Sequence, residues 1–211
     1  IDFEFFAKFP MALAGLAGCG LDAREPSPPP ALTASPVAPS AATSTHAALV
    51  GAPAREFVDI AWLDGRAHTL AELRGRVVLV RFWTDTCPFC RRTAPALVEL
   101  DAEFADRGLV VIGLYHPKPR GTARTLAEVE ESARAWDMKF LIGLDAAWAT
   151  LDDWWLAAHP REATSASFLI DRRGVIRLVH PGPEFAPTGA AQSRRDYAEI
   201  RAAIAVLLAE P

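Results

Sequence analysis

The chain has 211 residues, of which 51% are hydrophobic, and its 22 basic and 26 acidic side chains give a net charge of −4 at pH 7. This mildly acidic balance argues against the basic surface that nucleic-acid binding requires, so no nucleic-acid partner is expected. The length allows one domain or a small pair of domains.

Residues 1–19 have the pattern of a secretory signal. Residues 9–18 form an apolar segment that is too short to span a bilayer as a helix, and small residues follow it. The run Leu-Ala-Gly-Cys at 16–19 resembles a bacterial lipobox, which implies that Cys19 is lipidated and anchors the mature protein to a membrane. The alternative is a chance apolar leader in which Cys19 is a buried residue.

Residues 20–54 are rich in Pro, Ala, Ser and Thr and lack an apolar period. Such a segment cannot bury enough surface to offset the entropy of ordering, so we predict a disordered linker. Its prolines favour an extended polyproline II conformation, which gives a tether of on the order of 100 Å. A lipid anchor and a spacer would hold a folded domain away from a membrane surface.

The pattern of a folded domain begins at residue 55. Residues 57–62 are predicted to form a strand, Asp64 and Gly65 a turn, and residues 66–68 a return strand, which together make an N-terminal β-hairpin extension. Residues 77–83 are almost continuously apolar, as in a strand that is buried on both faces of a sheet.

Strand and helix patterns then alternate to the end of the chain. We predict a helix over 91–107, a strand over 109–115, a helix over 122–136, a strand over 140–142, a helix beginning at Asp145, a hairpin over 166–179 and a helix over 196–209. This order predicts an α/β fold in which helices flank a central mixed sheet.

The motif Cys87-Pro88-Phe89-Cys90 follows the buried strand after three short polar residues at 84–86. Proline is favoured at the first position of a helix, so Cys87 is expected at the N-terminus and Cys90 one turn further on the same face. The partial positive charge of a helix N-terminus stabilises a thiolate, the attacking species in disulfide exchange. We therefore predict a redox-active pair with Cys87 as nucleophile and Cys90 as resolving cysteine.

Several segments around this motif resemble one family. They are Leu-Val-Arg-Phe-Trp at 79–83, Ala-Pro-Ala-Leu at 94–97, Val-Val-Ile-Gly at 110–113 and Ser-Phe-Leu-Ile-Asp-Arg-Arg-Gly at 167–174. With the cysteine motif they resemble the thioredoxin fold, and more narrowly the TlpA/ResA-type, AhpC/TSA-related redoxins. The resemblance covers residues 55–211 and implies a thioredoxin-like domain that uses the Cys87–Cys90 disulfide and no other cofactor.

The resemblance also implies partners and a location. Its members exchange disulfides with protein dithiols and disulfides outside the cytoplasm, so we expect a periplasmic or otherwise extracytoplasmic protein serviced by a membrane electron donor or acceptor. The predicted domain has no cysteine besides Cys87 and Cys90, so no structural disulfide competes with that pair.

Six residues besides Pro88 are expected to support the site, and some depart from the family pattern: Trp83, Thr84, Thr86, Arg81, Ser165 and His116. Trp83 and Thr84 directly precede the motif, while Thr86 stands where tryptophan commonly comes before the first cysteine. Ser165 stands where the family places a cis-proline facing the disulfide. A serine there could present its backbone to a substrate or donate a hydrogen bond to the sulfur of Cys87.

Arg81 occupies the strand position at which thioredoxins often carry a buried acid. A cation close to the pair would lower the pKa of Cys87 and make the couple more oxidising. The favoured interpretation is that Arg81 reaches the edge of the sheet or pairs with a carboxylate, because an unpaired buried charge is costly.

Three histidines, His116, His159 and His180, lie in the predicted folded domain near strand ends. Each is interpreted first as an ordinary surface or loop residue. If His116 or His159 reaches the cysteines, it could act as a proton shuttle or complete a copper site with the two thiolates.

These features leave three functional hypotheses. The leading one is an extracytoplasmic thiol–disulfide oxidoreductase, with no metal site. The second is a peroxiredoxin-like peroxidase, for which Thr84 and Cys87 match part of the active-site pattern while Val80 stands where its proline is expected. The third is a copper-binding chaperone of the Sco type, whose two cysteines lie one residue further apart than Cys87 and Cys90.

Overall fold

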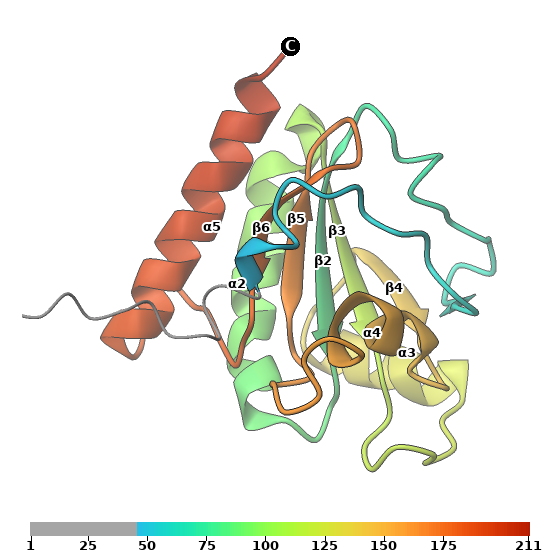
Figure 1. Ribbon diagram of the computed structural model, residues 1–211. Helices are drawn as coiled ribbons and strands as arrows, with labels where there is room; N and C mark the ends of the chain where they lie inside the picture. The colour runs from blue at the N-terminus through green and yellow to red at the C-terminus, as the bar shows by residue number, and fades with distance from the viewer. Residues whose placement is uncertain (1–45) are drawn as a thin grey trace, which may run out of the picture. The chain divides into compact units, whose positions relative to one another are not determined.

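The computed structural model describes residues 46–211 of the chain (Figure 1). The predicted signal and lipobox, including Cys19, and residues 20–45 of the predicted linker lie outside the described residues. Within the described part, no helix is both long and apolar enough to cross a bilayer.

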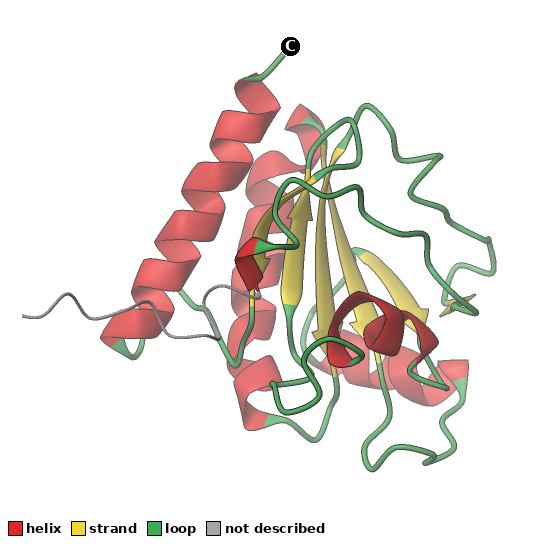
Figure 2. Cartoon of the chain, viewed as in Figure 1, coloured by secondary structure: helices red, strands yellow, loops and turns green. Residues whose placement is uncertain are grey.

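Six strands form one sheet in the order β1-β4-β3-β2-β5-β6 (Figure 2). Their bounds are Ala61–Trp62 for β1, Val77–Trp83 for β2, Leu109–Tyr115 for β3, Leu141–Leu144 for β4, Ser167–Ile170 for β5 and Ile176–His180 for β6. Strands β2, β3 and β4 run parallel, while β1, β5 and β6 each pair antiparallel with their neighbours. The predicted mixed sheet is confirmed, and every residue of the central strand β2 is buried as expected.

The helices follow the predicted order with shifted ends. They are α2 (Pro88–Phe104), the 3₁₀ turn η1 (Ala105–Arg107), α3 (Leu126–Ala135), α4 (Ala149–Leu151), the π-helical turn η2 (Asp152–Leu156) and α5 (Ala191–Ala209). Helix α3 begins after the predicted residue 122 because Thr125 and Glu128 form a reciprocal capping box there. The helix predicted from Asp145 is reduced to α4 and η2, with the backbone N–H of Leu151 donating to the Asp145 carboxylate over 2.8 Å.

The sheet has two differently covered faces (Figure 1). Helices α2 and α5 pack on one face against a core that includes Val77 and Leu79 of β2, and α3 joins α2 over Trp83. The turns α4 and η2 and the first described residues cover the other face, packing against a core that includes Val78 and Phe82. Alternate residues of β2 therefore point to opposite faces, as its pleat requires.

The predicted N-terminal hairpin does not form. The turn is present, because the N–H of Gly65 donates to the carbonyl of Trp62 over 3.2 Å. The Asp64 carboxylate then bonds the backbone N–H of Arg66 at 3.1 Å and the ring of His68 at 2.8 Å, which holds residues 66–68 in a loop. Strand β1 pairs instead with β4, about 80 residues further along the chain.

The folded domain begins before residue 55, so the predicted linker boundary is too late. The N–H of Gly51 donates to the carbonyl of Ile176 at 2.8 Å, and the N–H of Ile176 donates to Ala52 at 2.9 Å. Leu49 packs against the core of the α4 face. Residues 51–54 therefore lie along the start of the edge strand β6, where backbone hydrogen bonds compensate for the absence of an apolar period.

Candidate active site

The two cysteines lie at the carboxyl end of β2, where the chain enters α2. Cys87 is the N-cap residue, with extended backbone angles, and Pro88 occupies the first turn, as predicted. Cys87 is half-buried, whereas Cys90 is 2% exposed, and both are free thiols in this structure. A partner molecule can therefore reach Cys87 while Cys90 stays behind it.

The surroundings shift the pKa values of the two thiols in opposite directions. A hydrogen bond from the thiol of Cys90, supported by the backbone N–H groups of Phe89 and Cys90 and by the charge of Lys118, lowers the pKa of Cys87 to about 5 against the opposing effect of burial. The same thiol–thiol hydrogen bond, together with burial, raises the pKa of Cys90, and the positive charge of Arg81 opposes that rise. Cys87 is thus a thiolate at neutral pH, and Cys90 keeps its proton.

The loop before Cys87 is fixed by Asp85, a residue that the sequence analysis did not single out. Its carboxylate accepts hydrogen bonds from the Tyr115 hydroxyl at 2.9 Å, from Arg124 at 2.9 Å and from the Ser132 hydroxyl at 3.3 Å. These donors come from β3, the following loop and α3, so Asp85 connects the active-site loop to three separate segments. The only sequence signal for this role of Asp85 was its position between two threonines in the loop before the motif.

Trp83 is the last residue of β2, and Thr84 and Thr86 lie in the loop that leads to Cys87. Thr84 is fully buried, and its hydroxyl oxygen lies 3.5 Å from that of Thr86. Trp83 is buried in the same side-chain cluster as Cys90, with its ring centroid 5.0 Å from that of Tyr115. Because Trp83 packs in the cluster that holds Cys90, we expect its fluorescence to change with the redox state.

Arg81 is buried under the cysteine motif, which contradicts the favoured sequence interpretation. Its side chain is 1% exposed and does not reach the edge of the sheet. The guanidinium donates to the Ser167 hydroxyl at 3.1 Å and to the Pro183 carbonyl at 2.7 Å. Within residues 46–211 it forms no ion pair with a carboxylate. In the sequence, Arg81 stands between apolar residues of a strand. This pattern does not indicate that a hydroxyl and a carbonyl oxygen will accept hydrogen bonds from its guanidinium.

Ser165 lies beside Arg81. Its hydroxyl donates over 3.3 Å to the same Pro183 carbonyl that receives the guanidinium of Arg81. The expectation that this hydroxyl donates to the sulfur of Cys87 is therefore not met, because its single proton is used elsewhere. Ser165 supports the loop at Pro183, and that loop in turn supports Arg81.

The histidines bond to groups other than the cysteines. The Nε2 atom of His116 lies 2.9 Å from the Thr164 hydroxyl, and burial, with smaller contributions from the charges of Lys118 and Arg81, lowers the pKa of His116 to about 3. The His159 ring stacks on Trp155 with centroids 4.2 Å apart. These bonds give neither histidine a contact with Cys87 or Cys90 through which it could shuttle a proton.

The same geometry provides no histidine that could complete a copper site with Cys87 and Cys90. Across residues 46–211, no three His, Cys, Asp or Glu side chains gather as a possible metal site. The residue of the His116 loop that does act on Cys87 is Lys118, through its charge. The sequence analysis passed over this lysine, although its position just after β3 was a usable signal.

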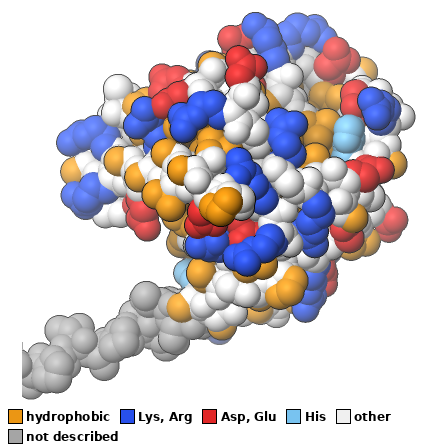
Figure 3. Space-filling view, turned by 90° about the horizontal axis from the view of Figure 1, so that it is seen from above, with side chains coloured by type: hydrophobic (Ala, Val, Ile, Leu, Met, Phe, Trp, Pro, Cys, Tyr) orange, Lys and Arg blue, Asp and Glu red, His pale blue; other side chains and the backbone are white. Residues whose placement is uncertain are grey.

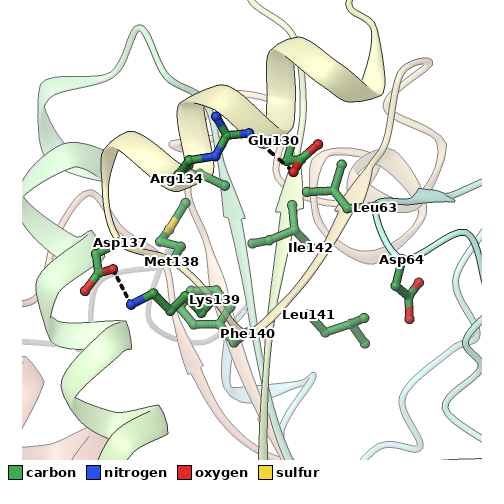
Figure 4. A pocket seen from close by; sticks show the side chains of 11 residues that line it. Leu63, Asp64, Glu130, Arg134, Asp137, Met138, Lys139, Phe140, Leu141 and Ile142 are labelled. Carbon is green, nitrogen blue, oxygen red and sulfur yellow. Dashed lines mark ion pairs between the residues drawn. The ribbon is translucent and has the colours of Figure 1, made fainter.

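A cavity of about 510 Å³ lies away from this site (Figure 4). Residues of α3, the loop after it and β4 line it together with Leu63 and Asp64, and two ion pairs, Glu130–Arg134 and Asp137–Lys139, lie at it. None of the predicted site residues contributes to the cavity, so it is not the place of the thiol chemistry.

The mixed sheet and a half-buried cysteine at the N-terminus of α2, with a buried cysteine one turn later, define a thioredoxin-like protein with a dithiol site. The model of the AhpC/TSA family matches residues 50–179, so the chain belongs to that family. This confirms the resemblance on which the sequence analysis relied.

Relatives and solved structures agree with this assignment. The thiol-disulfide oxidoreductase ResA of Geobacillus thermodenitrificans is 28% identical over 140 residues, which cover 66% of this chain and 74% of ResA. DipZ of Mycobacterium bovis is 32% identical over 124 residues, 57% of this chain but only 17% of DipZ. A thiol:disulfide interchange protein from Bacteroides sp. superposes with a TM-score of 0.56 at 19% identity, covering 74% and 90% of the two chains, which supports the thioredoxin-like fold. The enzyme class is thiol–disulfide oxidoreductase.

Proposed function

We propose that the Cys87–Cys90 pair is the redox centre of this oxidoreductase and exchanges disulfides with protein partners outside the cytoplasm. The observation that carries the proposal is the division of roles between the two sulfurs. Cys87 is accessible and has a pKa of about 5, whereas Cys90 is buried and has a raised pKa. An accessible thiolate backed by a protonated thiol is the arrangement that disulfide exchange needs.

The reaction proceeds through a mixed disulfide. The Cys87 thiolate attacks one sulfur of a partner disulfide, a bond forms between Cys87 and the partner, and the partner's other sulfur leaves as a thiolate. Cys90 then loses its proton and attacks the sulfur of Cys87. This forms the Cys87–Cys90 disulfide, releases the partner's second thiolate, and passes two electrons to the partner. Each step is reversible, so the same groups also oxidise a partner dithiol.

The surface next to the pair suits a protein partner. Phe89, between the two cysteines, is 39% exposed, and the guanidinium of Arg92 lies 4.8 Å from the centroid of its ring. Figure 3 shows the opposite end of the domain, away from the cysteines, where basic and acidic side chains are interspersed. Next to the pair, an exposed aromatic ring with a basic side chain beside it favours contact with a polypeptide chain.

The location and the anchor are part of the same proposal. A domain with a single cysteine pair avoids competition from structural disulfides, which matters most in an oxidising compartment. Lipidation of Cys19 would keep the domain at a membrane, close to a membrane electron donor or acceptor. Labelling of the expressed protein with palmitate, compared with a Cys19→Ser variant, tests the anchor independently of the chemistry.

The exchange activity is tested with cysteine variants and a disulfide-containing protein such as insulin. The wild type should reduce insulin in the presence of a dithiol, Cys87→Ser should show only background turnover, and Cys90→Ser should trap a mixed disulfide through Cys87. The Cys19→Ser variant serves as the matched control and should keep full activity. A wild type that consumes hydrogen peroxide rapidly but leaves insulin intact would instead identify a peroxidase.

A further inference from the structure

A row of polar side chains crosses the sheet behind the cysteines. Arg81 of β2 pairs in register with Ser167 of β5, and Ser167 pairs in register with His180 of β6. Residues paired in this way project from the same face of a sheet. This is the face that α2 covers, so the row lies beneath the motif, with Arg81 nearest to the two sulfurs.

The guanidinium of Arg81 has neutral hydrogen-bond partners but no acidic one. It bonds the Ser167 hydroxyl and the Pro183 carbonyl, and its Nε atom has no partner among the described residues. The ring of Phe185 lies beside it, with the centroid 5.5 Å from the guanidinium carbon. A fully buried cation without a counter-ion is costly, so some negative charge is expected close by.

The other ionisable groups around Arg81 supply less of that charge. Glu184, in the same loop as Pro183, stabilises the charge of Arg81 less than the cysteines do, and its carboxylate is bonded to Arg92 at 2.5 Å. His180 bonds Asp196 over 3.3 Å, and burial, with a contribution from Arg81, lowers the pKa of His180 to about 4. His180 and His116 are therefore neutral at pH 7, and Lys118 has the same sign as Arg81.

The sulfurs of the motif are the larger source of negative charge. A thiolate on either cysteine stabilises the charged form of Arg81, and at neutral pH Cys87 is the one that is ionised. In the reduced protein the pair carries one thiolate, which gives the buried cation a counter-charge. When the disulfide forms, the sulfurs become neutral and Arg81 loses that partner.

We propose that Arg81 stabilises the reduced pair over the disulfide, so that the oxidised protein acts as an acceptor of electrons from protein dithiols. The proposal rests on the proposed function and adds its direction, with reduced, cysteine-containing polypeptides as the substrate class. Arg81 acts through the charge of the sulfurs and is a positioning residue.

Oxidation of a substrate dithiol by the pair takes two steps. A substrate thiolate attacks the sulfur of Cys87, a substrate–Cys87 disulfide forms, and Cys90 leaves as a thiolate next to Arg81 before it takes up a proton. The second substrate thiol loses its proton and attacks the substrate sulfur of the mixed disulfide, which releases the Cys87 thiolate. The substrate loses two electrons and becomes a disulfide, while the Cys87–Cys90 disulfide is reduced.

The test compares equilibrium constants with graded ratios of reduced and oxidised glutathione. Arg81→Met should shift the equilibrium toward the disulfide at least tenfold, a change of about 30 mV for this two-electron couple. Arg81→Lys keeps the charge and should retain most of the wild-type value. Arg76→Met is the matched control, because the Arg76 side chain bonds the carbonyls of Gly108 and Leu109 at the other end of β2.

A second variant keeps the test decisive if Arg81→Met does not fold. Ser167→Asp leaves Arg81 in place and gives it a permanent carboxylate at hydrogen-bond distance, so the shift toward the disulfide should be the same in sign. Unchanged equilibrium constants in the folded variants would overturn the role of Arg81 while leaving the proposed function intact. A wild type that forms no reversible disulfide at all would overturn both.

Discussion

The two faces of the sheet differ at the carboxyl-terminal half of β2. On the α2 face, β2 presents Arg81 to the row of Ser167 and His180 and to the cysteines. On the other face the next residue, Phe82, packs edge-on against Trp154 and Phe168 with centroids 6.2 Å away in each case. Adjacent residues of one strand thus belong to a polar layer and an aromatic core. Changes at the polar layer beside the cysteines should therefore alter redox behaviour, whereas changes in the aromatic core should alter stability alone.

The largest expected effect is on the aromatic face. Trp155 is fully buried between His159 and Phe168, so Trp155→Ala should lower the free energy of unfolding by about 3–5 kcal/mol. Urea denaturation of the reduced protein measures this loss. The glutathione equilibrium of the folded variant should stay at the wild-type value. A shifted equilibrium would show that the two faces are not independent.

The next effect concerns the ionisation of Cys87. Its rate of alkylation by iodoacetamide should rise with pH around a midpoint of about 5, because the thiolate is the reactive form. An ordinary thiol, with a pKa of 9.0, would react mostly at alkaline pH. A midpoint close to 9 for Cys87 would contradict the environment described for the helix N-terminus.

The same shift predicts how stability depends on pH. Between pH 5 and 9 the unfolded chain keeps the proton of Cys87, and the folded protein does not. Stability of the reduced protein relative to Cys87→Ala should therefore rise with pH across this window and be lost as the pH falls toward 5. Thermal unfolding at several pH values measures the difference. A difference that is independent of pH would exclude a thiolate in the folded state.

A smaller effect is expected at the loop anchor. Asp85→Asn weakens the charge-assisted bond from Arg124 and leaves the Tyr115 hydroxyl with a poorer acceptor, so stability should fall by about 1–3 kcal/mol. Because Asp85 holds the loop that precedes Cys87, alkylation of Cys87 should also change several-fold. Asp137→Asn, at an exposed ion pair with Lys139, is the control and should change neither quantity.

The smallest effect is expected for Ser165→Ala. It removes one hydrogen bond, from the Ser165 hydroxyl to the Pro183 carbonyl, which keeps its shorter bond from Arg81. The loss of stability should be about 0.5–1.5 kcal/mol, and insulin turnover should be nearly unchanged. A large loss of turnover would show that the Ser165 hydroxyl takes part in the exchange itself.

The sequence predicted those parts of the molecule that depend on local patterns. The apolar run of β2, proline after Cys87 and the β5–β6 hairpin each combine a periodicity with a start or stop signal, and all three were confirmed. These elements fix the cysteines at the carboxyl end of a central strand. The family resemblance therefore rests on local sequence patterns alone.

The parts that the sequence missed depend on contacts between distant residues. Arg81 bonds the Pro183 carbonyl 102 positions away, and Asp85 bonds Arg124 39 positions away. Likewise, β1 pairs with β4 rather than with its neighbour in the chain, because Asp64 holds the intervening loop. No local pattern reports such pairings, and the electrostatics of the site depend on them.

The central claim is that Cys87 and Cys90 form a reversible redox pair, and equilibration of the wild type with graded glutathione ratios tests it most directly. Samples are quenched in acid, free thiols are alkylated and counted by mass, and tryptophan fluorescence follows the same transition. We expect one two-electron transition that interconverts both thiols with a disulfide and disappears in Cys90→Ser. If both thiols stay alkylatable at every ratio, or oxidise only irreversibly, the pair is not a disulfide-exchange centre.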